Sequence, residues 1–289
     1  MPPLLRALRP HQWAKNLLIL LPALAAHRVP GAGLLGALVA AVASFSLLAS
    51  AVYLVNDVVD VESDRAHPSK RHRPIAAGQL GVPAALTASG TLAVLSLALA
   101  LTLPPAFLQV WIAYLVVTSA YSAGLKRRVV LDVVVLSGLY TARVLAGAGA
   151  AGVPLSPWFL AFSIFLFVSL ALLKRTVESV GADHRDTGGF EGRGWRVEDQ
   201  PVLVAMGTAC AVGAALVYCL YITGDDVLRL YRRPEALWFG LPVLLYWLTR
   251  AWLLAVRGQV EDDPVVFALK DPASYASLAL FGLAVWWAT

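Results

Sequence analysis

Long apolar segments separated by short polar loops dominate the chain. Nine of them reach or approach the roughly 20 residues that a membrane-spanning helix needs. They lie at residues 16–28, 34–55, 84–103, 106–124, 130–150, 157–176, 202–222, 236–256 and 273–288. The first is short and contains Pro22, and the breaks carry turn-forming stretches such as VPGAG, LPP and GVPLSP. The pattern predicts an all-α, polytopic membrane protein with nine transmembrane helices.

Composition supports this class. Hydrophobic residues make up 59% and charged residues 14% of the 289 residues, whereas a soluble domain carries about 25% charged residues. Lys15 leads into a Pro-interrupted apolar run without an A-x-A-like site, which predicts an uncleaved first span rather than a signal peptide. Cys210 and Cys219 share one apolar segment and are expected to be core residues. We see no soluble appendage and expect a single domain over residues 1–289.

The distribution of basic residues predicts the orientation. Of the 23 lysines and arginines, 17 fall in alternate loops that the positive-inside rule assigns to the cytoplasm, and four fall in the opposite loops. The N-terminus is therefore expected inside and, with nine spans, the C-terminus outside. The arginines of residues 229–233 run against this bias. The net charge of +5 reflects the inner loops and gives no reason to expect nucleic-acid binding.

A carboxylate cluster follows the second apolar segment, in the stretch NDVVDVESD from Asn56. If the helix continues past Val55, Asn56, Asp60 and Asp64 fall in one stripe, with Asp57 beside it. Carboxylates on one face repel each other unless a cation lies between them. Magnesium takes oxygen ligands and is commonly held by one or two carboxylates together with substrate phosphates. The spacing therefore favours a metal-bridged diphosphate, with Glu62 pointing elsewhere.

Two interpretations of this cluster stay open. The residues can form a solvated interfacial turn with local Asp–Arg pairs, because charge at a helix end costs little. They can also form one half of a diphosphate site, whose other half is the basic run SKRHRP that follows at once. The regular acidic spacing and this basic run favour the second interpretation.

A second acidic stretch ends the sixth apolar segment on the same predicted side. Glu178 and Asp186 share a helix face if the helix continues, with Asp183 further round, whereas an end at Gly181 would remove that relation. An exposed loop is the alternative.

Two charges lie within the fifth apolar segment. Asp132 and Arg143 are about 16 Å apart along a helix, too far to pair with each other. We expect Arg143 to need a partner from another helix or a ligand anion, and Asp132 to be open to hydration near the inner end.

With NDVVDVESD and the second acidic stretch in place, the chain resembles the UbiA superfamily of intramembrane transferases over nearly its whole length. The resemblance implies nine helices around a central cavity and a signature N-D-x-x-D-x-x-x-D that binds Mg²⁺ and a diphosphate. Asn56, Asp57, Asp60 and Asp64 match every specified position. Many relatives also carry D-x-x-x-D in the second acidic region, whereas here Glu178 is followed by Ala182.

The stretches RPHQWAKN, NDVVDVESDRAHPSKRHRPIAAG, YSAGLK and ARVLAGAGAAGVPLSPWFL are similar to the branch of decaprenyl-phosphate phosphoribosyltransferases. That resemblance implies substrate contacts through Lys15, Asn16, Asn56, Arg65, Lys70, Arg73, Tyr121, Lys126, Arg127, Asp132, Arg143, Lys174 and Glu178. It implies Asp57, Asp60 and Asp64 as catalytic residues. The expected Mg²⁺ ligands are Asp57, Asp60, Asp64, Glu178 and Asp186. The loop at 181–200 and FALKDP near the C-terminus depart from the branch.

These residues predict a Mg²⁺-dependent transferase of a bacterial-type plasma membrane with its active site on the cytoplasmic side. The expected reaction moves a 5-phosphoribosyl group from phosphoribosyl pyrophosphate to a polyprenyl phosphate. The alternative enzyme is a prenyltransferase that moves an isoprenyl chain to an aromatic or other lipophilic acceptor. A secondary transporter is the more remote alternative, because most charges gather at helix ends and the halves show no obvious repeat.

Overall fold

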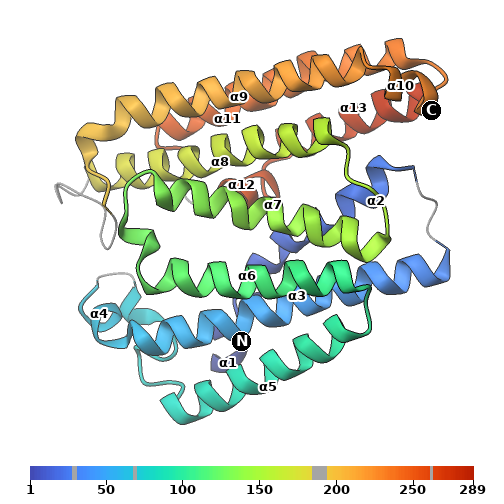
Figure 1. Ribbon diagram of the computed structural model, residues 1–289. Helices are drawn as coiled ribbons and strands as arrows, with labels where there is room; N and C mark the ends of the chain where they lie inside the picture. The colour runs from blue at the N-terminus through green and yellow to red at the C-terminus, as the bar shows by residue number, and fades with distance from the viewer. Residues whose placement is uncertain (28–30, 68–69, 184–193, 261–262) are drawn as a thin grey trace. The chain divides into compact units, whose positions relative to one another are not determined.

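The computed structural model describes residues 1–27, 31–67, 70–183, 194–260 and 263–289 (Figure 1). These residues form helices joined by turns, and no β-strand occurs among them. Seven helical stretches within them are long and apolar enough to cross a membrane. They are Ala32–Val59, Val82–Leu101, Pro105–Ala123, Leu131–Ala151, Pro157–Gly181, Val197–Ile222 and Pro234–Val256. The prediction of an all-α, polytopic membrane class is confirmed.

The main helices carry the labels of Figure 1. They are α3 (Ala32–Val59), α5 (Val82–Leu101), α6 (Pro105–Ala123), α7 (Leu131–Ala151), α8 (Pro157–Asp183), α9 (Gln200–Ile222), α11 (Gly240–Val256) and α13 (Pro272–Ala288). Shorter elements connect them: α1 (Pro3–Ala7), η1 (Pro10–Leu20), α2 (Leu21–Ala25), α4 (Val61–Ala66), η2 (Lys70–His72), η3 (Leu125–Arg127), η4 (Val197–Asp199), α10 (Asp225–Leu230), η5 (Pro234–Phe239) and α12 (Pro264–Ala268).

The first and last apolar segments differ from the other seven. The first, residues 16–28, takes in the end of the 3₁₀ helix η1 and the five-residue α-helix α2. This helical part is shorter than the about 17 residues that a straight spanning helix needs. Helix α13 has 17 residues. The count of nine spans stays a prediction.

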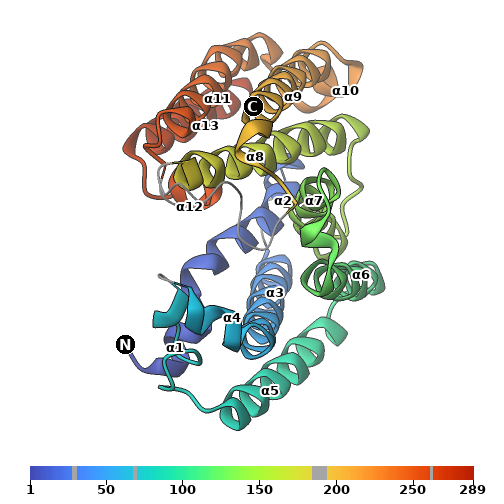
Figure 2. The ribbon, with the colours of Figure 1, turned by 90° about the vertical axis from the view of Figure 1, so that its left-hand side faces the viewer.

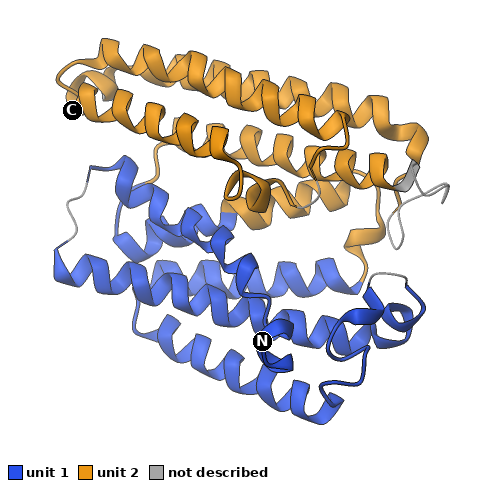
Figure 3. Cartoon of the chain, turned by 180° about the vertical axis from the view of Figure 1, so that it is seen from behind, with its two compact units in different colours: residues 1–123, 142–154 blue, residues 124–141, 155–289 orange. Residues whose placement is uncertain are grey.

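The described chain divides into two compact units, coloured separately in Figure 3. Unit 1 holds residues 1–123 and 142–154, and unit 2 holds residues 124–141 and 155–289, so the division falls within α7. The prediction of a single transferase domain over the whole chain is not tested by this division and stays a prediction.

Unit 1 is centred on α3, which packs along α5 and against η1 and α6. Phe45 of α3 is fully buried and meets the edge of Phe107 of α6 at a ring-centroid distance of 5.7 Å. The final turns of α7 lie very close to η1, because a Cβ on Gly147 would stand 2.0 Å from the carbonyl oxygen of Ile19. Only glycine permits that approach of the two backbones.

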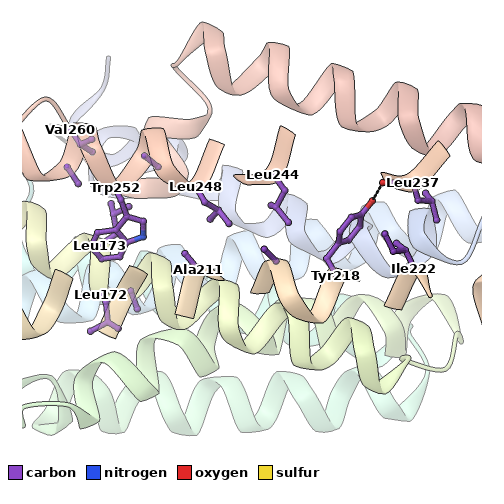
Figure 4. Packing of buried hydrophobic residues seen from close by; sticks show 14 of the residues in the cluster. Leu172, Leu173, Ala211, Tyr218, Ile222, Leu237, Leu244, Leu248, Trp252 and Val260 are labelled. Carbon is purple, nitrogen blue, oxygen red and sulfur yellow. Dashed lines mark hydrogen bonds between the residues drawn. The ribbon is translucent and has the colours of Figure 1, made fainter. Parts of the chain in front are cut away.

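Unit 2 is built from α8, α9, α11 and α13, which gather together in Figure 2. A cluster of buried side chains fills the space between these helices, as Figure 4 shows for Leu248, Trp252 and their neighbours. Trp252 donates from its indole nitrogen to Ser169 Oγ at 3.0 Å, and its ring lies where a Cβ on Gly207 would be. Cys210 and Cys219 are free thiols and are half-buried rather than fully buried core residues.

The start of α13 is fixed by a partly buried ion pair. Asp271 caps the helix, accepting from the backbone N–H of Ser274 at 2.8 Å, and it also accepts from both terminal nitrogens of Arg250 at 2.7 and 3.0 Å. Burial acts to raise the pKa of Asp271, but the hydrogen bonds from Arg250 and Ser274 outweigh it, so the pKa lies below the usual value.

Candidate functional site

The first acidic cluster lies where α3 ends. Helix α3 stops at Val59, Asp60 has φ −89° and ψ 7°, and α4 begins at Val61. The helix does continue past Val55, as supposed, but only to Val59. Backbone hydrogen bonds of helical spacing, from Asp60 N–H to Asn56 (2.9 Å) and from Asp64 N–H to Asp60 (2.8 Å), connect α3 to α4 across Asp60.

Asp57 and Asp64 converge on one arginine, whereas the predicted stripe paired Asp64 with Asn56 and Asp60. Both are 2% exposed. One guanidinium nitrogen, NH1 of Arg73, bonds Asp64 Oδ2 at 2.7 Å and Asp57 Oδ1 at 3.2 Å. The two residues are seven apart, close to two helical turns, so they lie on the same side of the chain despite the break. Asn56 and Asp60 lie beside them and are half-buried.

A second arginine, absent from the predicted contacts, also reaches this cluster. Arg9 NH2 bonds Asp57 Oδ1 at 2.5 Å, and its guanidinium lies over the ring of Tyr53 at 4.9 Å from the centroid. Arg9 has φ 52° and ψ 59°, a left-handed conformation that is uncommon for a side chain of this size. The residue is 48 positions from Asp57, so no local pattern signals the pair.

The other predicted basic contacts of this region are arranged differently. Arg65 bonds Glu62 at 3.2 Å on the surface and donates to the carbonyl oxygen of Ala76 at 3.3 Å. Glu62 therefore points away from the cluster, as predicted. Lys70 is half-buried at the start of η2. Of the residues predicted in the basic run, Arg73 is the one with an ion pair to Asp57 and Asp64.

The predicted contacts of the N-terminal segment are buried in unit 1. Lys15 is 7% exposed and Asn16 is fully buried. Asn16 donates to Ser46 Oγ at 2.9 Å and accepts from Arg143 Nε at 2.9 Å, while Arg143 also donates to the hydroxyl of Tyr114 at 3.0 Å. Arg143 thus has the partner from other elements that its position in an apolar helix requires.

Asp132 belongs to a second charged cluster, in unit 2. It is fully buried, so the hydration that its place near the inner end of the helix left open is not found. Its carboxylate lies 2.9 Å from Arg175 Nε and accepts from the indole nitrogen of Trp195 at 2.8 Å. Arg175 also forms an ion pair with Glu178, one helical turn further along α8. The structure thus pairs Glu178, a predicted metal ligand, with an arginine.

A third cluster of unit 2 joins Lys174 to a residue that sequence reasoning missed. Lys174 Nζ bonds Asp263 Oδ2 at 3.0 Å, and the Tyr140 hydroxyl lies 3.1 Å from both oxygens of Asp263. Asp263 is 8% exposed and caps α12 by accepting from the N–H of Val265. Its sequence signal was an aspartate directly before Pro264, a common start of a helix.

The remaining predicted residues have these positions. Helix α8 continues to Asp183, so Gly181 does not end it, and Asp186 lies outside the described residues. Tyr121 is half-buried in the last turn of α6. Lys126 and Arg127 form η3, and Gly194 passes so close that its added Cβ would be 2.5 Å from the carbonyl oxygen of Arg127.

The donor set of Asp57 and Asp64 fits a magnesium ion. Asp57 Oδ1 and Asp64 Oδ2 both accept from one nitrogen of Arg73, so the structure already places one positive centre between two carboxylates. Carboxylate oxygens are the ligands that Mg²⁺ prefers, and two of them suffice when waters and substrate phosphates complete the octahedron. Across the described ranges, no three His, Cys, Asp or Glu side chains converge as a full protein cage. The site therefore suits an ion shared with a phosphate ligand.

Fold and site together define an integral membrane protein with a paired-carboxylate, arginine-rich site at a helix end. The family comparison agrees: residues 17–278 match the UbiA prenyltransferase family, and the chain belongs to that family. The resemblance drawn from Asn56 to Asp64 is thereby confirmed.

Individual relatives share the whole length of the chain. It is 37% identical over 281 residues to the uncharacterised protein y4nM of Sinorhizobium fredii, covering 97% of this chain but about half, 54%, of that protein. It is 36% identical over 271 residues to the decaprenyl-phosphate phosphoribosyltransferase of Mycobacterium tuberculosis, covering 92% and 87% of the two chains.

A solved structure shows the same fold. A UbiA homologue from Archaeoglobus fulgidus bound to GPP and Mg²⁺ superposes with a TM-score of 0.74 at 16% identity, covering 98% of this chain and 99% of that one.

Proposed function

We propose that this protein is a Mg²⁺-dependent membrane transferase that moves a 5-phosphoribosyl group from phosphoribosyl pyrophosphate to a polyprenyl phosphate. The observation that carries the proposal is the convergence of buried Asp57 and Asp64 on the single cationic nitrogen of Arg73. A carboxylate pair arranged around one positive charge, beside further basic residues, has the chemistry that a metal-bound diphosphate requires. Family membership supports transferase chemistry, and the names of relatives support the phosphoribosyl donor.

Within this proposal, Asp57 and Asp64 hold the ion, with Asn56 and Asp60 beside them. Bound Mg²⁺ would supply neutralisation of the charge that develops on the leaving diphosphate. The chain itself positions the donor and excludes water, and Arg73 and Lys70 supply cations for phosphate oxygens. The C1–O bond of the ribose breaks with carbocation-like character, and the lipid phosphate attacks from the opposite face. No protein nucleophile is required.

The remaining assignments rest on the resemblance and are proposed with the function. Lys15, Tyr121, Lys126, Arg127, Lys174 and Glu178 stay predicted contacts of donor or metal. The proposed topology has nine spans in a single domain with the N-terminus in the cytoplasm. The active site then faces the cytoplasmic side of a bacterial-type plasma membrane.

A prenyltransferase is the second candidate function. The observation that favours it is the solved homologue bound to GPP and Mg²⁺, because an isoprenyl donor ends in a diphosphate as well. Transport is disfavoured because family membership points to group transfer.

Label transfer tests the proposed activity. The purified full chain is given Mg²⁺, polyprenyl phosphate and phosphoribosyl pyrophosphate labelled in the ribose. We expect a labelled lipid product that is lost on chelation and reduced at least a hundredfold in Asp64→Asn, since removing a group that stabilises transition-state charge costs about 10²–10³ in rate. Glu62→Gln, an exposed carboxylate of the same short helix, is the matched control and should keep wild-type activity.

Donor protection separates the two enzymes. Melting of the purified protein with Mg²⁺ is compared in the presence of phosphoribosyl pyrophosphate and of geranylgeranyl diphosphate. Stabilisation by the sugar donor alone supports the first function. Stabilisation by the isoprenyl diphosphate alone, with label transfer from it to a lipophilic acceptor, would replace the first function with the second.

A further inference from the structure

Arg73 stands at the point between the two carboxylates where a bridging cation would bind. Its NH1 nitrogen bonds Asp64 and Asp57 at 2.7 and 3.2 Å, so the two oxygens are no further apart than the sum of these distances. Both carboxylates are almost fully buried, while the Arg73 side chain is 28% exposed. The negative charge of the buried carboxylates is therefore balanced by a group whose side chain still reaches solvent, as does that of Arg9 at 24% exposure.

The two arginines of the cluster differ in how they are held. Arg9 bonds Asp57 alone, its guanidinium stacks on Tyr53, and its backbone has the left-handed conformation described above. Arg73 has both carboxylates as its ion-pair partners, through one nitrogen. It directly follows the three-residue element η2 and precedes a backbone turn in which Ala77 N–H bonds the Arg73 carbonyl oxygen at 2.8 Å. Arg9 therefore has the Tyr53 ring as a further contact beside its ion pair, whereas the Arg73 side chain reaches the carboxylates from a short loop.

We propose that Arg73 is the resident counter-cation of the Asp57–Asp64 pair and releases both carboxylates when a divalent ion arrives. This rests on the proposed function, in which the same pair holds Mg²⁺. The released guanidinium then donates to phosphate oxygens of the incoming diphosphate, for which its planar fork is suited. Two like charges this close in a buried setting repel each other, and a cation between them keeps both ionised. Arg73 supplies this cation before the donor binds, and the divalent ion supplies it afterwards. The ion and the diphosphate are therefore taken up together.

The exchange makes Arg73 a competitor of the metal and a ligand of the phosphate. Removing it should therefore have opposite effects on two affinities, which a purely structural residue would not produce. Loss of one positive charge roughly 5 Å from a divalent ion should tighten binding of the ion alone by about tenfold in a water-like dielectric. Binding of a diphosphate in the presence of saturating metal should weaken by about tenfold, the value of one charge-assisted hydrogen bond.

The first measurement uses Mn²⁺ alone, an oxygen-seeking ion that is visible by electron paramagnetic resonance. The full chain in detergent is titrated as wild type, Arg73→Gln, Arg73→Lys and Arg71→Gln. Arg71 is exposed on η2 two positions away, so its replacement removes the same charge without touching the carboxylates. We expect about tenfold tighter Mn²⁺ binding in Arg73→Gln and near wild-type binding in Arg73→Lys, which keeps the charge, and in Arg71→Gln.

The second measurement titrates inorganic pyrophosphate at saturating Mn²⁺ and follows the melting temperature. Arg73→Gln should bind it about tenfold more weakly than wild type and Arg71→Gln. Arg9 still pairs with Asp57 in the variant, which limits the loss of folding stability.

The possible outcomes test the exchange of Arg73 for a divalent ion separately from the proposed transferase function. Equal or weaker Mn²⁺ affinity in Arg73→Gln than in wild type overturns the exchange, and the metal-dependent function stands. Unchanged pyrophosphate affinity in Arg73→Gln overturns the phosphate half. Absence of Mn²⁺ binding in both wild type and Arg73→Gln overturns the exchange together with the metal-dependent function.

Discussion

Asp132 has two possible roles: it can stabilise the fold by its buried ion pair with Arg175, or it can contact the substrate, as the sequence predicted. The substitution Asp132→Asn distinguishes the two roles. Both side chains have 0% exposure, and their charged atoms lie 2.9 Å apart. Asp132→Asn keeps the side-chain size and retains an acceptor for Trp195. It removes the buried ion-pair partner of Arg175 and keeps Glu178, whose side chain is 32% exposed. Breaking a buried pair from one side costs about 3–5 kcal/mol. Glu178 offsets part of this, so we expect about 3 kcal/mol.

The assay is thermal unfolding of the purified chain in detergent. A loss of about 3 kcal/mol lowers the melting temperature by roughly 5–10 °C for a chain of this size. The matched control is Glu62→Gln, which removes a carboxylate from an exposed ion pair with Arg65. The Glu62 side chain is 85% exposed and the Arg65 side chain 54%. Exposed pairs contribute about 0–1 kcal/mol, so the control should stay within about 2 °C of wild type.

A double variant refutes or supports the reasoning. Asp132→Asn with Arg175→Met removes both charges, and such replacements are often neutral, so most of the lost stability should return. The pair does not behave as a buried ion pair if Asp132→Asn has the melting temperature of wild type. The same holds if adding Arg175→Met lowers the melting temperature further by an equal amount. Asp132 would then be free to serve the substrate.

Two more predictions follow from the structure. Because the pKa of Asp271 is lowered on folding, its contribution to stability is present above the unfolded value of about 3.9 and is lost as pH falls through the lower folded value. The melting temperature of wild type should therefore be well above that of Asp271→Asn at pH 6, and the difference should shrink as the pH is lowered below the unfolded value. A constant difference would contradict this. Gly147→Ala should lower the melting temperature by several degrees, since the new Cβ would lie 2.0 Å from the carbonyl oxygen of Ile19. The control Gly138→Ala, whose new Cβ has nothing within 4 Å, should not lower it. Equal melting temperatures of the two variants would contradict the close approach of α7 to η1.

Helix positions followed from apolar length, because seven of the nine predicted segments correspond to helices long and apolar enough to span. The local spacing also carried part of the site: Asp57 and Asp64 lie two turns apart and do meet. The break between α3 and α4 at Asp60 was not predicted, and nothing in NDVVDVESD marks it. Hydrogen bonds of helical spacing cross it, so the relation between Asp57 and Asp64 remains that of two helical turns.

Contacts between residues far apart in the sequence could not be predicted from periodicity. Arg9 is 48 positions from Asp57, Trp195 is 63 from Asp132, and Asp263 is 89 from Lys174. Each contact depends on packing between elements, for which a single sequence offers no period. The need for a partner was nevertheless predictable at Arg143, because a charge in an apolar helix requires one, and Asn16 fulfils it.

The most direct test of the central claim locates the ion. A crystal structure of the full chain with Mn²⁺ and pyrophosphate would show the metal by its anomalous signal. The account predicts a peak within about 2.3 Å of oxygens from Asp57 and Asp64, with Arg73 turned from them to a phosphate oxygen. A peak elsewhere, with Arg73 still bridging the two carboxylates, would contradict it.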